Sequence, residues 1–122
     1  MPVIPSFILK KVYVSGSLRN VGEGCQLQIK NTLAPVTIIG VGPVVFDGVA
    51  HGPASVVLVR GEERLAASDA SKTHPLAFAL NVVVTVIVEN VTLGAGVHRI
   101  GLDVNSKEAG RLKVEFSDTL SS

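Results

Sequence analysis

The chain has 122 residues, which is enough for one domain and too few for two ordinary ones. Its 11 basic and 10 acidic residues form no basic stripe or acidic run, which argues against a nucleic acid or an anionic membrane surface as partner. Apolar residues make up 47% and aromatic ones 4%, so the core must consist of Val, Leu, Ile and Ala, and the abundance of valine favours β-structure.

The N-terminal residues 1–11 carry their charges after the apolar residues, which is the wrong order for a secretory signal. The longest uncharged apolar run, Ala77 to Val88, is too short to span a membrane. A single cysteine, Cys25, excludes an intrachain disulfide and is typical of a reduced compartment. We therefore expect a cytoplasmic protein. We also expect an N-terminal extension at 1–11, a β-sandwich domain at 12–119 and a C-terminal tail at 120–122.

Apolar and polar residues alternate with a period of two in three segments, which predicts strands with one buried face and one solvent-exposed face. Their apolar positions are Cys25, Leu27 and Ile29, then His98, Ile100, Leu102 and Val104, and last Leu112, Val114 and Phe116. Cys25 is accordingly interpreted as a small buried hydrophobe and not as a nucleophile.

Two further segments, Val36 to Val45 and Val82 to Val88, are apolar throughout and predict strands covered on both faces or strands whose outward valines stay exposed. A shorter strand is predicted at Val56 to Arg60, with a tight turn at Gly61-Glu62 into a strand at Glu63 to Ala66. The segment Ala67 to Pro75 lacks the strand alternation and is predicted to contain a single helical turn.

The last strands, near 82–90, 97–106 and 111–118, are expected to form a meander. Glycine and proline turns separate the strands at short intervals. The predicted fold is therefore all-β: one antiparallel two-sheet β-sandwich.

The sequence contains no catalytic motif and no metal-ligand spacing around its histidines. His98 lies on the apolar side of its strand, which favours a core or interface position, and Asp47 is interpreted as a turn residue. His51 lies in a Gly/Pro turn and His74 precedes a proline, so both are free to contact a ligand or partner, although exposed loop histidines are usually solvated. An active site confined to this chain is not expected.

The order of strands and turns resembles the β subunit of bacterial C-glycoside deglycosidases. The resemblance covers nearly the whole chain from about residue 12, and its residues are strand and turn signatures. They are Gly16 to Asn20, Gln26 to Asn31, Gly40 to Gly42, Asp47-Gly48, Ala66 to Ser71, Pro75 to Phe78, Leu93 to His98 and Glu108 to Leu112.

The resemblance implies an accessory β-sandwich subunit that packs on a larger TIM-barrel α subunit in a hetero-oligomer. The α subunit would hold a divalent metal, Mn²⁺, and the acid–base residues, and this chain would hold no cofactor, no metal and no catalytic residue. The complex would act as a lyase that cleaves the C–C bond of 3-oxo-C-glycosides, such as flavonoid C-glucosides, by elimination. Candidate contacts to the substrate cleft or the partner are His51, His74 and Phe78.

A free-standing β-sandwich module that binds a carbohydrate or a protein is the alternative. The scarcity of aromatic residues weighs against sugar binding, because sugars usually stack on rings. The low charged fraction of 17% is compatible either with a covered surface or with a compact, valine-rich monomer.

Overall fold

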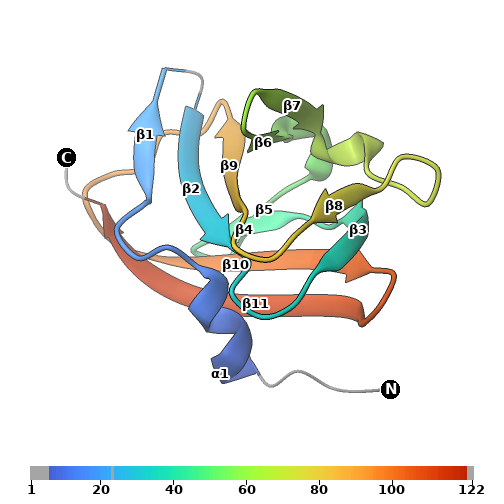
Figure 1. The fold of residues 1–122 in the computed structure, drawn as a ribbon. Helices are drawn as coiled ribbons and strands as arrows, with labels where there is room; N and C mark the ends of the chain where they lie inside the picture. The colour runs from blue at the N-terminus through green and yellow to red at the C-terminus, as the bar shows by residue number, and fades with distance from the viewer. Residues whose placement is uncertain (1–5, 23, 121–122) are drawn as a thin grey trace.

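Two antiparallel β-sheets pack face to face in the computed structural model, which describes residues 6–22 and 24–120 (Figure 1). The five-stranded sheet has the order β1-β2-β9-β6-β7, and the other sheet has the order β5-β4-β10-β3-β8 with β11 paired to β10. The predicted all-β, two-sheet sandwich is therefore confirmed. The predicted boundaries at 1–11 and 120–122 fall in part on residues outside the described ranges.

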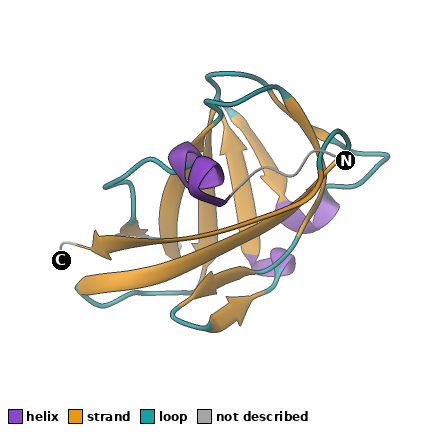
Figure 2. Ribbon diagram, turned by 90° about the horizontal axis from the view of Figure 1, so that it is seen from below, coloured by secondary structure: helices purple, strands orange, loops and turns teal. Residues whose placement is uncertain are grey.

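The strands of the five-stranded sheet are β1 (Arg19–Val21), β2 (Gly24–Lys30), β6 (Val56–Arg60), β7 (Glu63–Ala66) and β9 (Val83–Glu89). Those of the six-stranded sheet are β3 (Val36–Val41), β4 (Val44–Phe46), β5 (Val49–His51), β8 (Leu76–Phe78), β10 (Gly96–Ser106) and β11 (Gly110–Leu120). Short helical turns lie outside the two sheets (Figure 2). They are α1 (Ser6–Leu9) and the 3₁₀ turns η1 (Lys10–Val12), η2 (Pro53–Ser55) and η3 (Ala67–Asp69).

β10 is the long strand of the six-stranded sheet and changes partner along its length. Its whole length pairs with β11, so β4 and β3 must share its other edge, β4 at Ile100 and Gly101 and β3 at residues 104–106. Gly42-Pro43 separates β3 from β4, because proline cannot donate to a sheet ladder. The apolar segment predicted as one strand, Val36 to Val45, is thus two strands.

The predicted meander of the last three strands is wrong in one part. β10 and β11 form a hairpin, but β9 lies in the other sheet between β2 and β6. The turn at Gly94 to Gly96 therefore carries the chain from one sheet to the other. Glycines that permit a hairpin turn permit such a crossing equally well.

Valine and leucine side chains from both sheets form the core, as the composition predicts. Fully buried members include Leu27, Val56, Val88 and Ile100, and Cys25 is 0% exposed among them, which confirms its interpretation as a buried hydrophobe. Tyr13 forms an isolated bridge with Ile29 of β2, and its ring stacks on Phe116 of β11 with 4.0 Å between ring centroids. This aromatic pair joins the two sheets on the side where the chain enters the sandwich.

Candidate functional site

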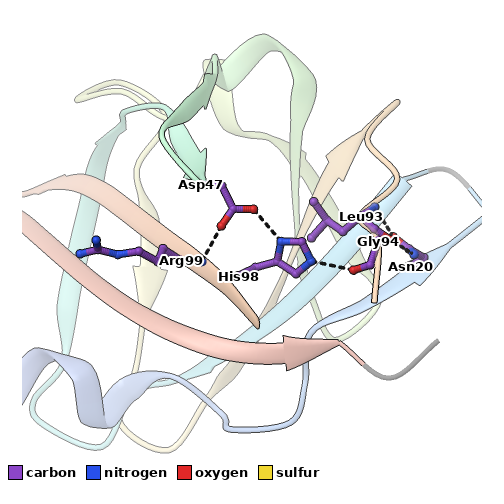
Figure 3. Close-up of polar contacts among 6 residues, drawn as sticks. All are labelled: Asn20, Asp47, Leu93, Gly94, His98 and Arg99. Carbon is purple, nitrogen blue, oxygen red and sulfur yellow. Dashed lines mark hydrogen bonds and ion pairs between the residues drawn. The ribbon is translucent and has the colours of Figure 1, made fainter. Parts of the chain in front are cut away.

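A polar cluster joins the β4–β5 turn to the start of β10 (Figure 3). Asp47 lies in that turn with a φ of 52°, and its Oδ2 atom is 2.6 Å from Nδ1 of His98. The other carboxylate oxygen accepts the backbone N–H of Arg99 at 2.9 Å. Nε2 of His98 is 2.7 Å from the carbonyl oxygen of Gly94. One histidine therefore joins a turn of the six-stranded sheet to the loop that arrives from the other sheet.

Both ring nitrogens of His98 face acceptors, which only the protonated imidazolium satisfies, because each of its nitrogens is a donor. The hydrogen bond to the Gly94 carbonyl raises the pKa of His98, and the bond to Asp47 raises it further. The same bond from His98, together with the Arg99 N–H, lowers the pKa of Asp47. With both nitrogens engaged, His98 has no lone pair with which to act as a general base.

Asn20 of β1 fixes the same inter-sheet loop from the opposite side. Its Nδ2 donates to the carbonyl oxygen of Leu93 at 2.8 Å, and its Oδ1 accepts the Leu93 N–H at 2.9 Å. Figure 3 shows Leu93 and Gly94 held between Asn20 and His98. The crossing between the two sheets is therefore anchored by side chains from both of them.

A shallow groove of about 730 Å³ runs along the outer face of β4, β10 and β11, next to this cluster. Three basic and three acidic side chains line it, and we call it the charged groove: Arg99, Arg111, Lys113, Asp47, Asp103 and Glu115. Gly101 adds no side chain to this face, and a Cβ atom there would lie 3.4 Å from Val45 and 3.9 Å from Glu115. The missing side chain deepens the centre of the groove.

Ion pairs occupy part of the charged groove. Arg111 binds Asp103 through Nη2 at 2.6 Å, which raises the pKa of the guanidinium, and Arg99 lies 4.0 Å from Glu115. Lys113 is exposed and lies opposite Asp103 on the hairpin, but has no ion pair among the described residues. A second hollow of about 460 Å³ shares Arg99, Lys113 and Glu115 and extends to Lys10. The groove therefore presents charges of both signs.

The three residues predicted from the sequence occupy separate places. His51 is half-buried in β5 beside Phe46, with 5.7 Å between ring centroids. His74 is exposed in a turn closed by reciprocal backbone bonds with Ser71. Phe78 is 7% exposed in β8 and belongs to the core. No hydrogen bond or ring contact joins the three within residues 6–22 and 24–120, and their roles as contacts stay predictions.

Sequence reasoning interpreted Asp47 as a turn residue and His98 as a core or interface residue, and missed their pairing across 51 positions. A signal did exist for the charged groove: Arg111, Lys113 and Glu115 alternate with apolar residues and must share the outer face of one strand.

Across the described part of the chain, no three His, Cys, Asp or Glu residues are grouped so as to hold a metal ion. None of the described helices is long and apolar enough to cross a membrane.

A sequence model of the family described as "Hydroxymethylglutaryl-CoA reductase, N-terminal domain" matches residues 8–121. No curated protein matches the chain at a significant level.

This match overturns the resemblance to the β subunit of C-glycoside deglycosidases. The predicted lyase activity on 3-oxo-C-glycosides and the accessory role in such a complex are wrong with it. The residues that carried the resemblance are strand and turn signatures, which any antiparallel sandwich needs for geometric reasons. The α subunit and its Mn²⁺ depended on that resemblance alone.

The family model covers residues 8–121 of the 122 residues and thus spans both sheets and every strand described above. The chain belongs to the hydroxymethylglutaryl-CoA reductase N-terminal domain family.

Proposed function

We propose that this domain is a non-catalytic docking domain of a hydroxymethylglutaryl-CoA reductase, with the charged groove as the surface that contacts the catalytic part of that enzyme. The family match suggests the reductase as the partner. The mixed charge of the groove is the observation that supports it as the contact surface. Whether the two parts share one polypeptide or are separate subunits does not change the chemistry of the contact.

The charge pattern favours a protein as the occupant. Three positive and three negative side chains give the groove no net formal charge, whereas a polyanion would be attracted by a field of one sign. Complementary charges of both signs fix the register of one protein surface on another and reject wrong partners. The exposed Lys113, free of an ion pair within the described ranges, is available for an acidic side chain of the partner.

The shape of the groove adds to this argument. The groove lies on the β10–β11 hairpin, whose eleven paired positions make it the longest ladder of the domain. A rigid hairpin keeps the charged side chains in fixed relative positions, which lowers the entropic cost of docking. Gly101 leaves room at the centre for a side chain of the partner.

The experiment measures binding of the purified chain to a purified hydroxymethylglutaryl-CoA reductase catalytic domain from the same organism by isothermal titration calorimetry. Lys113→Glu reverses the unpaired charge, and Gly101→Ala partly fills the centre with ordinary van der Waals contacts. We expect each variant to weaken binding about tenfold, which corresponds to about 1.4 kcal/mol.

Lys72→Glu is the matched control, because it makes the same reversal at an exposed position in the loop before β8. It should bind like the wild type. Absence of any binding by the wild-type chain would refute the docking function. Binding that tolerates both groove variants would refute the charged groove as its surface.

A further inference from the structure

An apolar pocket of about 140 Å³, partly open to the surface, lies between the two sheets, and we call it the cavity. Ile29, Val84 and Val86 line it from the five-stranded sheet, and Val36, Val104 and Val114 are among those that line it from the other. Protein interiors hold few voids larger than a water molecule, so a space of this size stands out in so small a domain.

The walls of the cavity are almost entirely apolar. Two of the lining residues have polar side chains, and both are engaged elsewhere. Asn31 donates to the carbonyl oxygens of Ala34 and Phe78 at 2.7 and 2.8 Å, and Asp103 binds Arg111. Among the described residues, no buried side-chain nitrogen or oxygen lacks a hydrogen-bond partner. The walls therefore offer a water molecule no free hydrogen-bond partner, so the cavity favours an apolar occupant over water.

The composition explains why the space is unfilled. The chain has one tyrosine, four phenylalanines and no tryptophan, and the inward positions around the cavity are mostly valine and leucine. In this chain the short branched side chains from the two sheets leave part of the intervening layer unfilled. An empty cavity lowers stability in proportion to its volume, whereas an apolar occupant restores the lost contacts.

We propose that this cavity is a binding site for a small uncharged apolar molecule with the bulk of one aromatic ring or a short branched alkyl group. The size follows from the volume, because a dry apolar cavity of roughly 150 Å³ accommodates benzene. The absence of charge follows from the walls, since an ion there would find no unpaired charge and no free polar group among the described lining residues.

One wall of the cavity lies outside the sheets. Leu9 ends α1 and Val12 ends η1, and both side chains line the cavity while α1 and η1 pack on β11. Residues 6–12 take part in no strand pairing, so displacement of this wall breaks no ladder hydrogen bond. Displacement of this segment would therefore admit a ligand without opening either sheet.

Benzene is the probe for this site. Titration into the wild-type chain, followed by methyl NMR of Val, Leu and Ile, should give saturable shifts that are largest at lining methyl groups such as those of Val86 and Val104. Thermal unfolding should move to higher temperature as benzene is added, because the ligand binds the native state.

Val104→Phe places a ring in the space, and Val104→Leu adds one methylene group should the larger side chain prevent folding. Both variants should weaken benzene binding, Val104→Phe by at least tenfold. Val97→Phe is the matched control on the same strand, because Val97 is 69% exposed and lines no part of the cavity.

The absence of saturable shifts in the folded wild type would overturn the proposal. Shifts that persist unchanged in a folded Val104→Phe variant would overturn it as well. Neither result involves the reductase catalytic domain, so this test and that of the docking function fail independently.

Discussion

Tyr13 donates a hydrogen bond to Asp118, a residue 105 positions later, and so ties the N-terminal segment to the last strand. The carboxylate also accepts the backbone N–H of Gly16 at 2.9 Å. Burial raises the pKa of Asp118, but these bonds outweigh it, so the net pKa is lowered. Burial raises the pKa of the Tyr13 hydroxyl most, and the hydrogen bond to Asp118 raises it further.

Tyr13→Phe removes this bond and keeps the ring that stacks on Phe116. We expect the free energy of unfolding to fall by about 1–2 kcal/mol, because the acceptor is charged and partly buried. Urea unfolding at pH 7 measures the loss. Ser117→Ala, on the outer face of the same strand, should change it by less than about 0.5 kcal/mol. Equal stability of the Tyr13→Phe variant and the wild type would contradict the role assigned to the bond.

The Asp47–His98 pair predicts a specific pH dependence of stability. The pKa of His98 is raised above 6.5, so its contribution is complete below pH 6.5 and is lost as pH rises through the higher folded pKa. The pKa of Asp47 is lowered below 3.8, so its contribution is complete above pH 3.8 and is lost as pH falls through the lower folded pKa. The pair therefore stabilises the fold between these limits.

Urea midpoints from pH 5 to pH 9 test this dependence in a His51→Gln/His74→Gln background, in which His98 is the one remaining histidine. The parent should be more stable than its Asp47→Asn derivative at pH 6, and the difference should shrink towards pH 9. Asp118 lies opposite His98 on β11 and remains in both proteins, so its contribution cancels. A difference that grows with pH would reverse the sign and contradict the assignment.

Gly24 is the glycine whose replacement should cost most. A Cβ atom there would lie 2.0 Å from the carbonyl oxygen of Val88, so the β2–β9 ladder must shift to admit it. We expect Gly24→Ala to lower the free energy of unfolding by about 2–3 kcal/mol, as overpacking does. Gly22→Ala is the control, because nothing lies within 4 Å of its Cβ position. Equal urea midpoints for the two variants would disprove the close approach.

The thiol of Cys25 should be inert in the folded protein. Burial raises its pKa to about 11, and the side chain is 0% exposed. Ellman's reagent should label urea-unfolded chain completely while the native chain stays unmodified over the same interval. Rapid labelling of native protein at pH 7 would show that β2 opens far more readily than its pairing with both β1 and β9 indicates.

Local patterns in the sequence predicted much of the fold. Alternation at Cys25 to Ile29 and at Leu112 to Phe116 gave strands with the correct inward faces, since side-chain direction follows from period two alone. The crossing at Gly94 to Gly96 was mistaken for a hairpin because turn residues determine that the chain bends and not which sheet it joins. Asp47 and His98 meet through tertiary packing, which no local window contains.

The family assignment failed for a related reason. The resemblance relied on residues such as Asp47-Gly48 and Glu108 to Leu112, whose types are dictated by turn geometry and ladder formation. The charged groove and the apolar cavity share β4, β10 and β11, and apart from Leu102 and Asp103 they are lined by different residues. Alternation alone therefore predicts which residues point to each face, but their assembly into a groove depends on how β4, β10 and β11 are ordered.

The partner exchange along β10 has a consequence for synthesis on the ribosome. β3 can pair with β8, and β4 with β5, before residues 96–106 are made, but these two strand pairs join one sheet only through β10. The nascent chain must therefore hold apolar strand edges unpaired until its last quarter emerges, an interval in which such edges are open to aggregation. Completion of this sheet waits for the final hairpin, and a pause in translation before residue 96 would prolong the exposure.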